Sequence, residues 1–130
     1  MPQLLRGFTL GPLSWSPGHR GVDLAARAGA VVRAPADGVI FYVGVLAGRP
    51  VLSIDQGGGL VSSFEPAISR VPRGTRVHQG EAVAVLAPGV THCAPSTCLH
   101  WGVRSAGRYI DPLTLVPARR GPAVLLPLLR

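Results

Sequence analysis

Lysine is absent from this chain, and all 13 of its basic residues are arginine. Asparagine is absent as well. A chain without lysine has no side-chain amine for a Schiff base, for general base catalysis or for carrying biotin or lipoate. Mechanisms that need a lysine, and the carrier domains that depend on one, are therefore excluded.

Acidic residues are also few, 6 against 13 arginines, which leaves a formal charge of +7. A positive charge attracts anionic partners such as nucleic acid or cell-wall polymers. The arginines are scattered along the chain, and aromatic residues make up only 5% of it. The pattern favours a cationic, solvated surface, and we expect no nucleic-acid partner.

Apolar runs of membrane-spanning length are missing too. The C-terminal run 123–129 is far shorter than the roughly 20 residues that a transmembrane helix needs. Residues 1–6 lack the apolar stretch of a secretory signal. We therefore expect no transmembrane segment. The chain is either cytoplasmic, or a mature or excised domain, or one whose true start lies upstream.

Short strands and turns dominate the pattern that is present. Glycine, at 17 residues, and proline, at 13, are spread throughout, and hydrophobic residues make up 47%. We expect one domain (18–115) between an N-terminal arm (1–17) and a Pro-interrupted tail (116–130). We also expect an all-β, mostly antiparallel fold without a helix of ten residues. The predicted strands are 31–34, 38–45 (with Val39, Phe41 and Val43 on one face), 50–55, 60–65, 82–87 and 99–104.

One segment has a period of three, which fits neither a strand nor an α-helix. It comprises Val71, Gly74, Val77, Gly80 and Val83. Such a period is typical of a chain that turns tight corners, with glycine where side chains would clash. The stretch 29–40 resembles the signature of barrel-sandwich hybrid folds.

Two motifs place metal-ligand atoms at fixed spacing. His19 and Asp23 lie four residues apart, and His100 lies on a distant predicted strand. Two imidazoles and a carboxylate make a three-ligand set with one position open, which is typical of hydrolytic zinc sites. On the strand, Cys98, His100 and Arg104 share one face, opposite Leu99, Trp101 and Val103.

Together these motifs resemble the M23 family of metallopeptidases, the lysostaphin and LytM type that cleaves peptidoglycan cross-bridges. The residues that carry the resemblance are His19-x-Gly21-x-Asp23, the spacing of Gly29, Val32, Ala34 and Gly38, the segment from Val71 to Val83, Cys98-Leu99-His100 and Tyr109-Ile110-Asp111-Pro112. The resemblance implies a barrel-sandwich hybrid (duplicated hybrid motif) and one Zn²⁺ held by His19, Asp23 and His100. Tyr109 is either a substrate contact or a packing residue.

The chain departs from the family at two further histidines beside the metal. Cys98 takes the place of one, and Pro66 the place of the other. A missing general acid or base typically lowers the rate by about 10²–10⁴. Glu65 is a candidate substitute base and His92 a candidate proton donor, although each alone can equally be a surface residue. We assign no role to His78.

Cys93 and Cys98 allow three interpretations. They can form a disulfide across a short loop, Cys98 can be a fourth metal ligand that closes the site, or both can be buried thiols. A disulfide implies an oxidising compartment. We favour the disulfide, because the resembling family works outside the membrane and the cysteine count is even.

Two functions therefore remain in view. The first is a zinc-dependent metalloendopeptidase that hydrolyses peptide cross-bridges of peptidoglycan through a metal-activated water. The second is a catalytically impaired module that binds cell wall or regulates another hydrolase. Phosphoryl transfer through a histidine pair leaves Asp23 unexplained. We slightly favour the peptidase, as a monomer at the cell envelope or outside the cell.

Overall fold

A computed structural model describes residues 4–9, 20–89, 93 and 97–115 of the chain. Strands dominate these residues, and every strand pair among them is antiparallel. The helical element of this part is a single 3₁₀ turn, η1 (Pro112–Leu115). The predicted all-β, antiparallel class is confirmed. No helix in the described part is long and apolar enough to cross a membrane.

The six predicted strands are present, each with ends within one residue of the prediction. They are β3 (Val31–Arg33), β4 (Gly38–Leu46), β5 (Arg49–Asp55), β6 (Leu60–Glu65), β9 (Ala82–Leu86) and β10 (Cys98–Ser105). Five further strands, each of two to four residues, were not predicted. They are β1 (Leu4–Arg6), β2 (Val22–Ala25), β7 (Ala67–Ser69), β8 (Arg76–Val77) and β11 (Arg108–Ile110).

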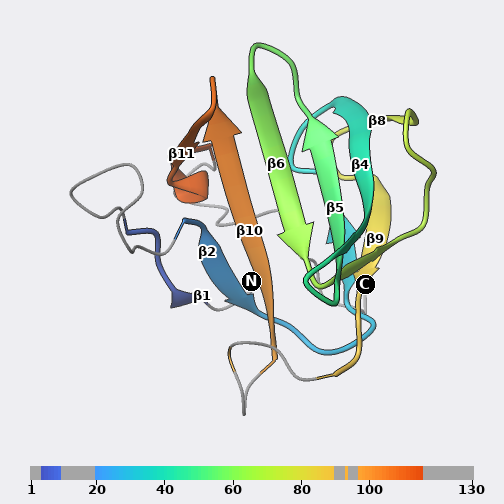
Figure 1. The fold of residues 1–130 in the computed structure, drawn as a ribbon, viewed down its shortest axis with the longest axis vertical. Helices are drawn as coiled ribbons and strands as arrows, with labels where there is room; N and C mark the ends of the chain where they lie inside the picture. The colour runs from blue at the N-terminus through green and yellow to red at the C-terminus, as the bar shows by residue number, and fades with distance from the viewer. Residues whose placement is uncertain (1–3, 10–19, 90–92, 94–96, 116–130) are drawn as a thin grey trace.

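The strands form two sheets. The larger has the order β1-β2-β10-β6-β5-β4-β8, with β11 added on β10, and the smaller has the order β3-β9-β7. In Figure 1 the long strands β10, β6 and β5 lie side by side, and β9 of the smaller sheet lies behind β4 and β5. Buried side chains from both sheets make one core, which includes Leu52, Ile54 and Phe64 from the larger and Val32 and Val83 from the smaller.

Strand β10 has one face in this core and the other outside it. Leu99, Trp101 and Val103 are fully buried, as the predicted alternation requires. The Trp101 ring stacks on Phe64 at a centroid distance of 6.1 Å, and its indole N–H donates to Ser62 Oγ at 3.2 Å. Because one face of β10 is fixed in the core, His100 must lie on the other.

In strand β4, the apolar side chains of the predicted face point away from the core. Phe41 and Val43, on the predicted apolar face, are 54% and 40% exposed, whereas Ile40 is buried. The register of β4 against β5 shifts between Ile40 and Tyr42. On both sides of this shift the odd-numbered residues are more exposed than Ile40. Phe41 and Val43 are therefore in contact with solvent, and Phe41 also lines a surface groove.

The segment with the period of three turns corners, as predicted. Gly74 and Gly80 have φ values of 91° and 85°, a backbone conformation that side-chain-bearing residues rarely adopt. Their N–H groups donate to the carbonyls of Ile40 and Ala34 at 2.8 and 2.9 Å. Val77, between these corners, and Val83, after the second one, are fully buried.

Substitution of Ser62 by alanine tests the buried polar contact of Trp101. Ser62 is itself buried, so S62A leaves the indole N–H without this acceptor. We expect the free energy of unfolding to fall by about 1–3 kcal/mol, measured by urea denaturation. S105A, at the partly exposed end of β10, is the control and should change it by less than about 0.5 kcal/mol. Equal stability of the two variants would refute the assignment.

Candidate metal centre

The centre is built on the pairing of β2 with β10. In this antiparallel pair, Asp23 lies directly opposite His100. Residues opposite each other across a pair of strands have their side chains on the same face and in reach of one another. Asp23 Oδ1 lies 2.8 Å from His100 Nδ1. The motif residues, 77 positions apart in sequence, are thus brought together by strand register.

Burial makes this pair a plausible cation site on chemical grounds. The Asp23 side chain is 1% exposed and that of His100 is 18% exposed. A buried carboxylate is costly unless it meets a hydrogen-bond donor or a cation. Tetrahedral ligand atoms at about 2.0–2.2 Å from one zinc lie roughly 3.3–3.6 Å from each other. The donor types therefore fit Zn²⁺, and the two atoms, now 2.8 Å apart in a hydrogen bond, need to separate by less than about 1 Å to share it.

Of the predicted ligands, His19 lies outside the described residues, and its place as the third ligand stays a prediction. The next residue, Arg20, is described, and its guanidinium lies 5.3 Å from the ring centroid of Tyr109. This cation–π contact gives Tyr109 a packing role beside the site. His92, the candidate proton donor, is also outside the described residues. His78 is 77% exposed in a turn and lies 3.9 Å from Asp37.

Gly21 has a steric role that the sequence alone did not reveal. A Cβ atom at this position would lie 2.5 Å from the Trp101 carbonyl oxygen and 2.7 Å from His100 Nε2. Both distances are shorter than non-bonded atoms tolerate. The absence of a side chain at Gly21 therefore leaves room for the His100 ring next to the start of β2.

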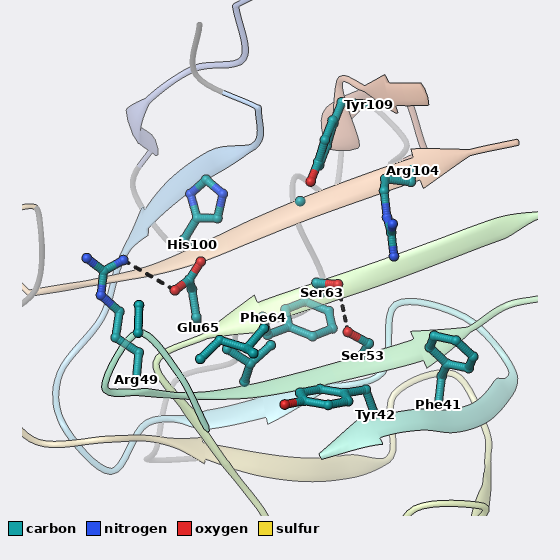
Figure 2. A pocket seen from close by; sticks show the side chains of 14 residues that line it. Phe41, Tyr42, Arg49, Ser53, Ser63, Phe64, Glu65, His100, Arg104 and Tyr109 are labelled. Atoms are coloured by element: carbon teal, nitrogen blue, oxygen red, sulfur yellow. Dashed lines mark hydrogen bonds and ion pairs between the residues drawn. The ribbon is translucent and has the colours of Figure 1, made fainter. Parts of the chain in front are cut away.

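A groove of about 570 Å³ opens beside His100 on the face of β10 that points away from the core. Figure 2 shows Glu65 and His100 next to each other on neighbouring strands, and the register of β6 against β10 places them opposite one another. Glu65 Oε2 accepts a hydrogen bond from Arg49 Nη1 at 3.3 Å. Arg104 and Tyr109 also line the groove. Glu65, the candidate base, thus lies beside His100, a predicted metal ligand. Pro66 is the next residue in the chain.

The two cysteines form a disulfide, with their Cα atoms 6.1 Å apart. Cys98 is fully buried at the start of β10, and Cys93 is partly buried. Both sulfur atoms and a carboxylate oxygen of Asp23 lie within 4.8 Å of one another. A disulfide sulfur is not a thiolate, so neither cysteine is a zinc ligand in this oxidised state.

The sequence model of peptidase family M23 matches residues 17–112. Among curated proteins, "Uncharacterized protein Rv2891" of Mycobacterium tuberculosis and "Uncharacterized protein Mb2915" of Mycobacterium bovis are each 41% identical over 119 residues. These matches cover 88% of this chain and 48% of each relative. The chain therefore spans about half the length of the curated relatives it matches.

Solved structures with the same fold include LytU, lysostaphin and a zinc-containing peptidase. LytU superposes with a TM-score of 0.77 at 18% identity, covering 98% of this chain and 94% of LytU. Lysostaphin gives 0.71 at 20%, covering 98% and 56%. A zinc-containing peptidase from Vibrio cholerae gives 0.69 at 26%, covering 84% of this chain and 35% of that one. The fold is thus shared along nearly the whole chain.

Substitution of Gly21 by alanine tests whether this position holds the His100 ring in place. The added methyl group must displace either the ring or β10. We expect G21A to bind Zn²⁺ at least about tenfold more weakly, as changes next to metal ligands typically do, measured by competition with a chromophoric chelator. G7A is the control, because the nearest atom to its added Cβ is 4.0 Å away. Unchanged Zn²⁺ affinity in G21A would show that Gly21 is not needed to hold the His100 ring in place.

Proposed function

Because the chain belongs to peptidase family M23, we propose that it is a zinc-dependent metalloendopeptidase that hydrolyses peptide cross-bridges of bacterial peptidoglycan. The observation that carries the proposal is the convergence of Asp23 and His100, at 2.8 Å, beside an open groove. A metal bound by these residues would be within reach of a substrate peptide that lies in the groove. We place the functional domain at residues 18–115.

The ligands in this proposal are His19, Asp23 and His100. Bound zinc supplies a Lewis acid that polarises the scissile carbonyl and activates water at neutral pH. Asp23 contributes the negative charge from a buried position, and His100 contributes a neutral nitrogen from the rigid strand β10. Because both come from paired strands and not from loops, their separation is fixed before substrate arrives.

Glu65 is the group that we propose to take the proton. It lies opposite His100 on β6 and faces the same groove. Its partner Arg49 is 51% exposed, and an ion pair of this kind is worth only about 0–1 kcal/mol. The carboxylate can therefore exchange Arg49 for a water or a substrate group at little cost.

The alternative is a catalytically impaired module that binds cell wall or regulates another hydrolase. Pro66 and Cys98, which replace the two family histidines, favour it. The retained Asp23–His100 pair favours the peptidase, since a module that needs no metal has no evident use for a buried carboxylate beside an imidazole. The disulfide supports an oxidising location, outside the cell or in its envelope. We expect the protein to act there as a monomer.

Removal of either described ligand tests the metal assignment. We expect D23A and H100A, made separately, to lose stoichiometric zinc, because a three-ligand site with one ligand missing binds the metal far more weakly. Zinc per chain is measured by elemental analysis after gel filtration. H78A, which removes an exposed histidine, should keep one zinc per chain. Stoichiometric zinc in both ligand variants would overturn the assignment.

Substitution of Glu65 by glutamine tests its role in proton transfer. E65Q keeps the shape of the side chain but removes its basicity, so we expect peptidoglycan turnover to fall by about 10²–10⁴ with zinc content unchanged. Release of cross-bridge fragments from purified sacculi is the measurement. E81Q is the matched control, because Glu81 accepts a hydrogen bond from the His78 N–H and does not line the groove. Wild-type turnover in E65Q would exclude it as the base.

A further inference from the structure

The Cys93–Cys98 disulfide lies against the same carboxylate that faces His100. Both sulfur atoms are within 4.8 Å of an Asp23 oxygen, and His100 Nδ1 is 2.8 Å from Asp23 Oδ1. Strand register explains the arrangement, because Cys98 lies opposite Ala25 and His100 opposite Asp23 on the same pair of strands. Asp23 thus has an imidazole on one side and two sulfur atoms on another.

Reduction changes what this cluster can bind. A dithiol reductant donates two electrons, the S–S bond breaks, each cysteine gains a proton, and the dithiol becomes a disulfide. Attack is open at Cys93, which is partly buried, while Cys98 is fully buried and leaves as the inner thiolate. Thiolates are strong zinc ligands, whereas disulfide sulfurs are not.

We propose that the reduced chain has a second, closed mode of zinc binding, in which Cys93, Cys98 and Asp23 ligate the ion together with His100. Four protein ligands leave no position for water, and such sites are structural and not catalytic. Three of the ligands belong to the described cluster, and His100 adjoins it through Asp23 at 2.8 Å, while the consequence for activity rests on the proposed peptidase. Reduced protein would hold zinc in an inert form, and oxidation would open the site.

The described geometry favours a metal in the reduced cluster, because both sulfur atoms and an Asp23 carboxylate oxygen already lie within 4.8 Å of one another. Zinc ligation stabilises thiolates. Zinc should therefore both bind the reduced form more tightly and make the disulfide easier to reduce.

Cobalt substitution separates the two modes of binding. Oxidised wild-type protein, protein reduced by a dithiol that is then removed anaerobically, and the C93S/C98S variant are each titrated with Co²⁺ alone. Thiolate-to-cobalt charge transfer gives a near-ultraviolet band that nitrogen and oxygen ligands do not give. We expect this band only in reduced wild-type protein, at one cobalt per chain, and about half its intensity in reduced C93S. We also expect at least tenfold tighter binding in the reduced form.

The controls distinguish this proposal from the peptidase. If reduced wild-type protein binds one cobalt without the band, the thiolate site is refuted, while the open site stands. If oxidised protein and C93S/C98S bind no cobalt but reduced protein shows the band, the thiolate site stands and the proposed zinc peptidase fails. Loss of the near-ultraviolet tryptophan circular dichroism in reduced, metal-loaded protein, with C93S/C98S still folded, also refutes the closed site.

Discussion

The register of β2 against β10 is the constraint on which the site depends. It sets Asp23 opposite His100, and the core fixes it, because Trp101 and Leu99 are buried on one face of β10 and Val22 and Leu24 are buried on β2. A slip of one residue would turn His100 toward the core and Trp101 toward solvent. Hydrophobic burial along β10 is therefore what positions a pair of polar ligand atoms to within hydrogen-bond distance.

Three other features take their places from that register. Gly21 leaves room for the His100 ring where β2 begins, Cys98 brings a disulfide to the Asp23 carboxylate, and Glu65 on β6 lies on the far side of His100. Asp23, His100, Glu65 and the Cys93–Cys98 sulfur pair are thereby gathered along one face of the sheet, at the end of a groove. Among the described residues, strand pairing places Asp23, His100 and Glu65.

The sequence predicted the long strands and the ligand face well, because both follow from period-two alternation over five or more residues. It missed β1, β2, β7, β8 and β11, which have two to four residues and pair with longer neighbours, although the equally short β3 was found from its apolar run. The face of β4 that holds Phe41 and Val43 lies away from the core, which the alternation alone did not show. The approach of Cys98 to Asp23 and the steric role of Gly21 depend on contacts across strands, which one-dimensional spacing does not contain. The roles of His19 and His92 remain predictions.

Zinc content and peptidoglycan turnover, measured on one purified, oxidised sample of wild-type protein, test the central claim most directly. We expect one zinc per chain and release of cross-bridge peptide fragments, with both lost after chelation and both restored by added Zn²⁺. One zinc per chain without any turnover would contradict the peptidase. It would mean that Glu65 does not replace the imidazoles missing at Pro66 and Cys98, and it would favour a metal-binding module that binds cell wall or regulates another hydrolase.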